Sequence, residues 1–88
     1  FRQWSPQLFV DYHEMGAFGV EYFFPPVADP VNANIPAGAR EWLHRFGRAN
    51  GEAFSQRGWL FFVGEHFDLF YPGYGDAWPT LRGAIGMT

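Results

Sequence analysis

The chain has 88 residues (48% hydrophobic, 22% aromatic, 17% charged) and a net charge of −3, which allows one small domain with a modest core. Its six basic residues form no cluster, which argues against nucleic-acid binding, and no apolar run approaches the roughly 18 residues of a membrane span. The absence of cysteine excludes disulfides and thiolate ligands, so any metal must be held by His, Asp or Glu.

The aromatic content and the two ends of the chain predict a piece of a larger fold. Four Trp, four Tyr and eleven Phe exceed what a self-contained domain of this length normally needs. The sequence starts at Phe1 without an initiator methionine and stops within an apolar run. We therefore expect residues 1–88 to be one partial domain without an internal boundary. The alternative is a processed small protein.

The first half of the chain predicts extended segments. Residues 8–13 (LFVDYH) are mostly apolar and β-favouring, which is typical of a strand buried on both faces. A second extended piece, 20–26 (VEYFFPP), ends at two prolines. The following stretch, 27–38, holds two more prolines and two asparagines. Because proline fixes φ and removes a hydrogen-bond donor, this stretch is predicted to be an irregular connector.

The clearest predicted element is an amphipathic helix over residues 37–57. Its apolar residues recur at intervals of three and four, which places on one face Trp42, Leu43, Phe46, Ala49, Ala53 and Phe54. Gly47 and Gly51 each weaken a helix by about 1 kcal/mol relative to Ala. They lie at the margin of this face, where a neighbouring element can approach closely. Gly58 is a suitable residue to end the helix.

The last third of the chain predicts a strand, a loop and a strand. Residues 59–63 (WLFFV) favour a strand, 67–79 (FDLFYPGYGDAWP) a loop rich in Gly, Pro and Tyr, and 83–88 (GAIGMT) a final strand. Strand, long loop, helix, strand, loop and strand is the order of an α/β protein.

His13 and Glu14 are the first candidates for chemistry. A zinc-protease helix needs a second histidine one turn later, but that position is Ala17, and Gly16 interrupts the turn. A second interpretation places His13 at the carboxyl edge of a strand, where ligand sites of α/β sheets gather. Asp11 then shares its face and can hold the other ring nitrogen. A third interpretation is a buried structural histidine, and the residues alone leave both open.

The other ionisable candidates carry less signal. His44 falls on the polar face of the predicted helix, so exposure is expected. His66 has acidic neighbours, Glu65 and Asp68, but no third convergent ligand. Glu14 is either a general base or a loop carboxylate that accepts backbone hydrogen bonds, and its role stays open.

The stretch 71–79 (YPGYGDAWP) is the other unusual feature. Gly73 and Gly75 permit positive φ and large dihedral changes. Tyr71 and Tyr74 can therefore lie on a mobile lid that brings a phenol over a substrate. The alternative is a packed aromatic loop.

Taken together, three motifs resemble the M14 family of zinc carboxypeptidases, and in particular a bacterial branch of it. They are DYHEMG, YFFPPVADPVNANIP and FDLFYPGYGDAWPTLRGAIGMT, in the family's order over nearly the whole chain. The resemblance implies an α/β fold, a mixed sheet flanked by helices, of which this chain is a fragment from the C-terminal half of the catalytic domain. It implies hydrolysis of peptide bonds near a C-terminus and a secreted or periplasmic parent, although the residues themselves indicate no compartment.

The resemblance also implies a site for one Zn²⁺ ion. Two ligands form a His-x-x-Glu motif upstream, and the third is a strand-end histidine that His13 matches. A general-base glutamate is expected just beyond Thr88. This chain contains neither the His-x-x-Glu motif, nor the upstream arginines for the substrate's terminal carboxylate, nor that glutamate. Since zinc needs three protein ligands here, the 88 residues alone are expected to bind it negligibly and to hydrolyse nothing.

The implied partners are a peptide substrate and the remainder of the parent catalytic domain. Tyr71 is the best match for the family's substrate-covering tyrosine, with Tyr74 as its rival. Asp76 either lines the pocket for the substrate's last side chain, where it would favour basic residues, or matches a structural aspartate. The alternative functions are a catalytically inactive module of the same fold that binds a peptide or sugar, and an independent aromatic-rich binding domain.

Overall fold

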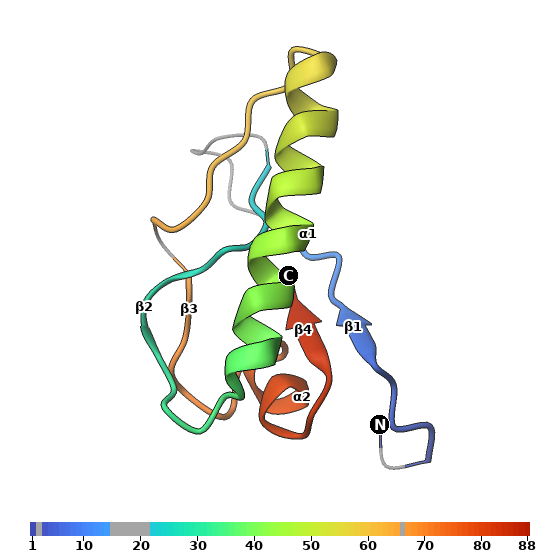
Figure 1. Cartoon of the computed structure of the whole chain (residues 1–88), viewed down its shortest axis with the longest axis vertical. Helices are drawn as coiled ribbons and strands as arrows, with labels where there is room; N and C mark the ends of the chain where they lie inside the picture. The colour runs from blue at the N-terminus through green and yellow to red at the C-terminus, as the bar shows by residue number, and fades with distance from the viewer. Residues whose placement is uncertain (2, 15–21, 66) are drawn as a thin grey trace.

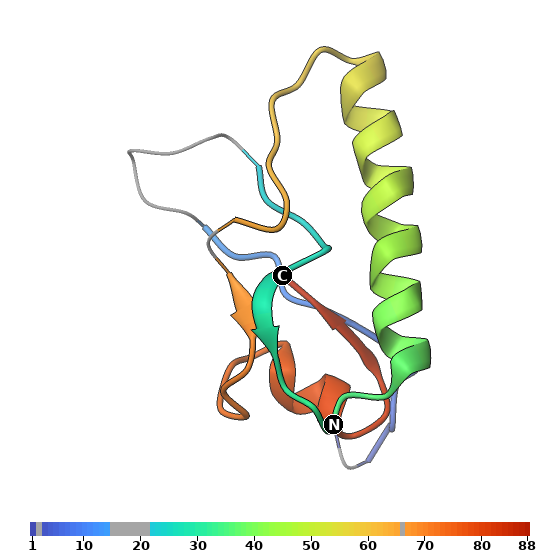
Figure 2. The ribbon, with the colours of Figure 1, turned by 60° about the vertical axis from the view of Figure 1, so that its left-hand side comes forward.

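The computed structural model describes residues 1, 3–14, 22–65 and 67–88. Their elements are β1 (Leu8–Val10), β2 (Ala28–Val31), α1 (Ala37–Gln56), β3 (Asp68–Leu69), α2 (Ala77–Leu81) and β4 (Ile85–Met87). Figure 1 shows α1 running along the molecule in front of the strands, and Figure 2 shows the strands as a layer on one side of it. The predicted α/β class is confirmed at this level.

The strands form two parallel pairs. β1 pairs with β4, with Leu8 opposite Ile85 and Val10 opposite Met87. β2 pairs with β3, with Ala28 opposite Asp68. The buried core lies where the first half of α1 meets β3, α2 and β4, and it consists of Ile35, Ala39, Leu43, Leu69, Ala77 and Met87. The carboxyl ends of β1 and β4 therefore meet at one edge, beside this core.

The predicted first and last strands are present but shorter. β1 covers Leu8–Val10 and β4 covers Ile85–Met87. The expectation that the first strand is buried on both faces is wrong, since Leu8 and Val10 are 42% and 40% exposed. The physical reason is that β1 has a single neighbouring strand in the described part of the chain, so its apolar side chains are only half covered.

The helix is confirmed over Ala37–Gln56, and it ends as expected. Gly58 adopts a φ of +68°, and the amides of Gly58 and Trp59 donate to the carbonyls of Ser55 and Phe54. These two bonds satisfy helix carbonyls that would otherwise lack partners, and only a residue tolerant of positive φ allows the chain to reverse so sharply.

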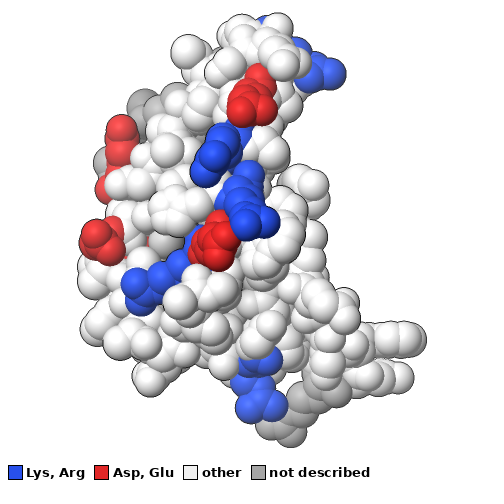
Figure 3. All heavy atoms as spheres, viewed as in Figure 1, with Lys and Arg blue, Asp and Glu red and all other residues white. Residues whose placement is uncertain are grey.

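The buried face of α1 differs in part from the predicted one. Leu43 is buried, but Trp42 is 47% exposed, and its ring lies 4.9 Å from the guanidinium of Arg45. Arg45 also pairs with Glu41 at 2.6 Å. Charged side chains gather along this outer face (Figure 3). Trp42 therefore belongs to the charged face, because a large amphipathic ring can be stabilised by a cation instead of by burial.

Among the described residues, no helix is long and apolar enough to cross a membrane.

The two helix glycines lie where the chain approaches α1 most closely, as predicted. A Cβ at Gly47 would collide with the backbone carbonyl of Pro25, and a Cβ at Gly51 would lie 3.3 Å from the ring of Phe61. The missing side chains let the 22–26 and 59–63 segments pack directly on the helix. Glycine lowers the helix propensity at these positions, and the close packing that it allows offsets this loss.

Two stretches predicted as irregular contain regular structure. β2 lies within 27–38, while β3 and α2 lie within 67–79. β2 tolerates Pro30 because its register shifts between Ala28 and Val31, so the ladder passes over the residue that has no N–H. Pro79 is tolerated because it stands in the first turn of α2, where amides have no partner within the helix. Pro30 and Pro79 therefore mark a bulge and a helix start, while Pro72 lies in a turn.

The strand predicted over 59–63 is wrong. Within it only Phe62 forms a bridge, with Phe23 in parallel orientation. The rings of this segment pack on other rings instead: Phe61 stacks on Phe24 at 4.8 Å, and Trp59 meets Phe54 edge-on at 5.4 Å. Aromatic packing thus replaces a continuous ladder.

The extended piece 20–26 is described from residue 22 onward. Its first two residues lie outside the described part of the chain, as do 15–19 and His66.

The glycine contacts predict opposite effects for one chemical change on one helix. Replacing Gly47 by Ala should lower the free energy of unfolding by about 1–3 kcal/mol, since overpacking against Pro25 outweighs the gain in helix propensity. Gly38→Ala is the control, because nothing lies within 4 Å of the added carbon; it should stabilise by as much as ~1 kcal/mol. Urea unfolding followed by circular dichroism measures both, and equal effects would contradict the close approach.

Candidate functional site

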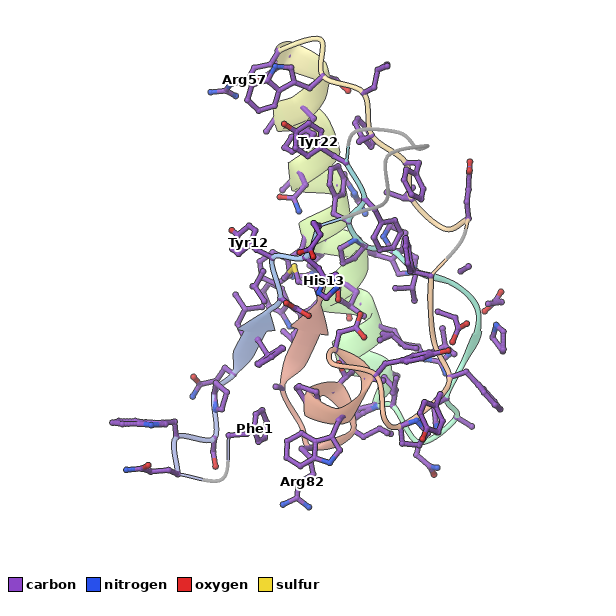
Figure 4. All side chains as sticks on the ribbon, turned by 180° about the vertical axis from the view of Figure 1, so that it is seen from behind. Phe1, Tyr12, His13, Tyr22, Arg57 and Arg82 are labelled. Atoms are coloured by element: carbon purple, nitrogen blue, oxygen red, sulfur yellow. The ribbon has the colours of Figure 1, made fainter. Side chains whose placement is uncertain are left out.

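Asp11 and His13 lie just past the carboxyl end of β1. The amide of Asp11 donates to the carbonyl of Met87 at 2.9 Å, which continues the β1–β4 ladder by one residue. His13 Nδ1 lies 3.5 Å from Asp11 Oδ2, while Tyr12 between them is 96% exposed and points away (Figure 4). The structure thus brings the predicted pair together by the two-residue alternation of extended backbone. Glu14 is exposed beyond them.

The tyrosine loop, residues 71–75, passes beside this pair. A Cβ placed on Gly75 would lie 3.3 Å from Asp11 Oδ2, so the loop backbone runs directly along the carboxylate. The rings of Tyr71 and Tyr74 meet edge-on at 5.4 Å and are 61% and 44% exposed. The amide of Tyr74 donates to the carbonyl of Tyr71 at 3.2 Å and closes the turn. The rings therefore pack on one another and still face solvent.

The loop glycines act through their size. Among the described residues, the glycines with positive φ are Gly58, Gly64 and Gly83. Gly73 instead lies against the ring of Tyr71, where a Cβ would overlap it, and Gly75 lies against Asp11. Their missing side chains let one aromatic ring fold over the loop and let the loop approach the carboxylate.

Asp76, at the start of α2, is buried at the carboxyl end of β4. Its Oδ2 accepts a hydrogen bond from the hydroxyl of Thr88 at 3.1 Å, and its side chain is part of a residue only 8% exposed. Its backbone carbonyl accepts from the hydroxyl of Thr80 at 2.7 Å. Thr80 in turn accepts from the amide of Gly86 at 2.9 Å. A Cβ on Gly86 would strike the Asp76 carbonyl, so this polar cluster fixes α2 on β4 at close range.

The environment of Asp76 is unfavourable to its charge. Burial raises the pKa of Asp76 above its ordinary 3.8, and the negative charge of Asp11 adds to the rise. The hydroxyl of Thr88 and the backbone amides of Asp76 and Ala77 oppose it. A carboxylate held in this way suits an anchoring role at the end of β4 better than an accessible pocket floor, because its Oδ2 is already engaged.

Other candidates lie apart from this edge. His44 is exposed on α1, as expected, and it borders a shallow groove together with Asp29 and Arg40. Within the described residues, no group of three His, Asp or Glu side chains is arranged to hold a metal ion. Sequence reasoning did not identify the buried hydroxyl of Thr80 or the half-buried hydroxyl of Thr88. Threonines in or beside otherwise apolar or glycine-rich runs were the available signal.

Comparison of the chain with protein-family models, with curated proteins and with solved structures found no match.

Because ionising the buried Asp76 destabilises the folded state, the stability of the protein is predicted to depend on pH. Because its folded pKa lies above the unfolded value of 3.8, the folded state holds this proton more tightly, and stability from this group is lost as pH rises through the folded pKa. Asp76→Asn keeps an acceptor for Thr88 and removes the charge. The stability of this variant relative to the native protein should therefore rise between about pH 3 and about pH 7. Urea unfolding across this range measures it.

Asp29→Asn provides the matched control, since Asp29 is exposed and makes the same change in formal charge. The relative stability of Asp76→Asn should change more with pH than that of Asp29→Asn. A flat difference for Asp76→Asn would contradict the raised pKa.

Proposed function

We propose that this chain forms part of the catalytic domain of a zinc metallocarboxypeptidase, in which His13 supplies one of three zinc ligands. The observation that carries the proposal is the Asp11–His13 pair at the shared carboxyl edge of β1 and β4. With Nδ1 turned to Asp11, the other ring nitrogen, Nε2, is available for a metal. The His13 side chain is 64% exposed, so the imidazole is accessible. The motif resemblance supports the same assignment.

The donor set fits zinc in part. An imidazole whose second nitrogen faces a carboxylate is a usual zinc ligand arrangement. Zinc in a catalytic site takes three protein ligands, and the described residues offer no such group, so the remaining two would come from the upstream His-x-x-Glu motif that the resemblance implies. When bound, zinc would polarise the scissile carbonyl and acidify a water molecule.

The chain's own residues have distinct tasks in this proposal. Asp11 Oδ2 lies 3.5 Å from His13 Nδ1, so the carboxylate would favour the tautomer with the proton on Nδ1 and would orient the ring. One exposed phenol of the tyrosine loop, that of Tyr71, would cover the peptide and donate a hydrogen bond to it. Asp76 holds the hydroxyl of Thr88 and so sets the direction in which the chain leaves β4, toward the expected general-base glutamate. These tasks use residues that share one edge of the β1–β4 pair.

Zinc binding tests the ligand assignment. In the full-length gene product, His13→Ala should abolish zinc retention and hydrolysis of C-terminal peptide bonds. Asp11→Asn should weaken zinc affinity by about 10- to 100-fold, because loss of the carboxylate removes the orientation of the ring. Isothermal titration with Zn²⁺ and release of C-terminal amino acids are the measurements. The 88-residue chain alone should bind zinc negligibly.

His44→Ala is the control, since it removes an exposed imidazole from α1 far from this edge along the chain. Zinc affinity should be unchanged in this variant. Retention of tight zinc binding by His13→Ala, or tight one-to-one binding by the isolated chain that depends on His13, would overturn the assignment.

The two tyrosines predict different kinetic effects. Tyr71→Phe should lower kcat/KM by about tenfold, the effect of one hydrogen bond lost from the transition state. Tyr74→Phe should stay within about twofold, since its phenol would not contact the reacting peptide. Steady-state rates on a peptide with a free C-terminus distinguish them, with zinc content measured alongside. The reverse pattern would assign the covering role to Tyr74.

A further inference from the structure

Asn32 joins two segments that lie far apart in sequence. Its side-chain Nδ2 donates to the carbonyl of Phe70 at 2.9 Å, across 38 positions of the chain. Its Oδ1 accepts from the backbone amide of Asn34 at 3.0 Å and from the side-chain amide of Asn34 at 3.2 Å. The Nδ2 side therefore faces an acceptor and the Oδ1 side faces two donors, which determines the orientation of the amide group.

The backbone of Asn32 adds further bonds. Its amide donates to the carbonyl of Leu69 at 3.0 Å, and its carbonyl accepts from the amide of Ile35 at 3.0 Å and from Arg40 Nη2 at 3.2 Å. One half-buried residue therefore connects the end of β2, the first turn of α1 and the end of β3.

Phe70 is the residue from which the tyrosine loop departs. Its amide donates to Asp68 Oδ1 at 2.8 Å, and its carbonyl accepts from Asn32. Its side chain is 56% exposed, so burial contributes little to its position. Two side-chain hydrogen bonds hold the start of the loop, while the Asp76–Thr80–Thr88 contacts hold its end.

The side-chain amide of Asn32 matches both kinds of partner. The group must donate to a carbonyl and accept from an N–H at the same time, which asparagine does with one planar side chain. An aspartate of the same shape would keep the acceptor for Asn34 but would place a second oxygen against the Phe70 carbonyl. The isosteric change therefore removes one hydrogen bond and leaves the volume unchanged.

We propose that Asn32 is a positioning residue that anchors the tyrosine loop at Phe70 and thereby sets where Tyr71 and Tyr74 stand relative to the Asp11–His13 pair. The anchoring itself follows from the contacts of Asn32. Its consequence for catalysis rests on the proposed function.

Hydrogen exchange of the full-length protein tests the anchor. Asn32→Asp should speed exchange in peptides covering residues 67–76 by roughly tenfold, the effect of losing one hydrogen bond from the closed state. Exchange in the middle of α1 should not change. Zinc affinity should also stay unchanged, while kcat/KM on a C-terminal peptide falls, a combination that general destabilisation does not produce.

Two variants serve as controls. Asn34→Ala removes a side-chain donor from the same connector but leaves the Asn34 backbone amide on Asn32, and Asn50→Asp makes the same charge change on α1. Neither should speed exchange in 67–76. Unchanged exchange in Asn32→Asp, an equal rise in α1, or an equal effect of Asn50→Asp would each overturn the anchoring role. If the native protein releases no C-terminal residues, the proposed function fails, and the exchange experiment still decides the anchor.

Discussion

The parallel pairing of β1 with β4 places the first and last strands of the described chain side by side. Leu8 stands opposite Ile85 and Val10 opposite Met87, and the Asp11 amide extends the ladder onto Met87. Because both strands run in the same direction, everything that follows each of them emerges at one edge. Asp11 and His13 follow β1 there, and Thr88 follows β4. The candidate site exists because of this register.

The strand β4 is also in close contact with α2. Gly86 admits the Asp76 carbonyl and the Thr80 hydroxyl where any side chain would exclude them. Thr80 is fully buried, yet its hydroxyl both donates and accepts, so it adds order without an unsatisfied polar group. The same principle recurs at Gly47, where Pro25 lies against α1. In a chain with a small core, glycine contacts and satisfied polar groups fix positions that apolar burial alone leaves loose.

The candidate site combines two parts, a platform at the strand edge and an exposed loop. The platform is the β1–β4 edge with the buried carboxylate of Asp76 behind it, and the exposed loop is the one that carries Tyr71 and Tyr74. The loop has little apolar burial of its own and is held at its ends, by Asn32 on one side and by the contacts of Asp76 on the other. Such a loop can move between its anchors while its ends stay fixed relative to the β1–β4 edge.

The local elements of this protein were determined by the sequence itself. The helix over Ala37–Gln56, its end at Gly58, the short strands at either end and the glycine contacts on α1 all follow from periodicity and residue size, which act over a few neighbouring residues. The alternation that joins Asp11 to His13 is equally local. Sequence reasoning failed where prolines were taken as loop signals, since a register shift accommodates Pro30 and a helix start accommodates Pro79.

Only the tertiary structure decided which distant residues meet. The bond from Asn32 to Phe70 and that from Thr88 to Asp76 join residues with no periodic relation in sequence. The exposure of Trp42 and the aromatic packing that replaces a strand at 59–63 likewise depend on what lies opposite each side chain. Hydrogen bonds and ring contacts of this kind are short-ranged in space, so they are specified only once the strand register has brought their partners together.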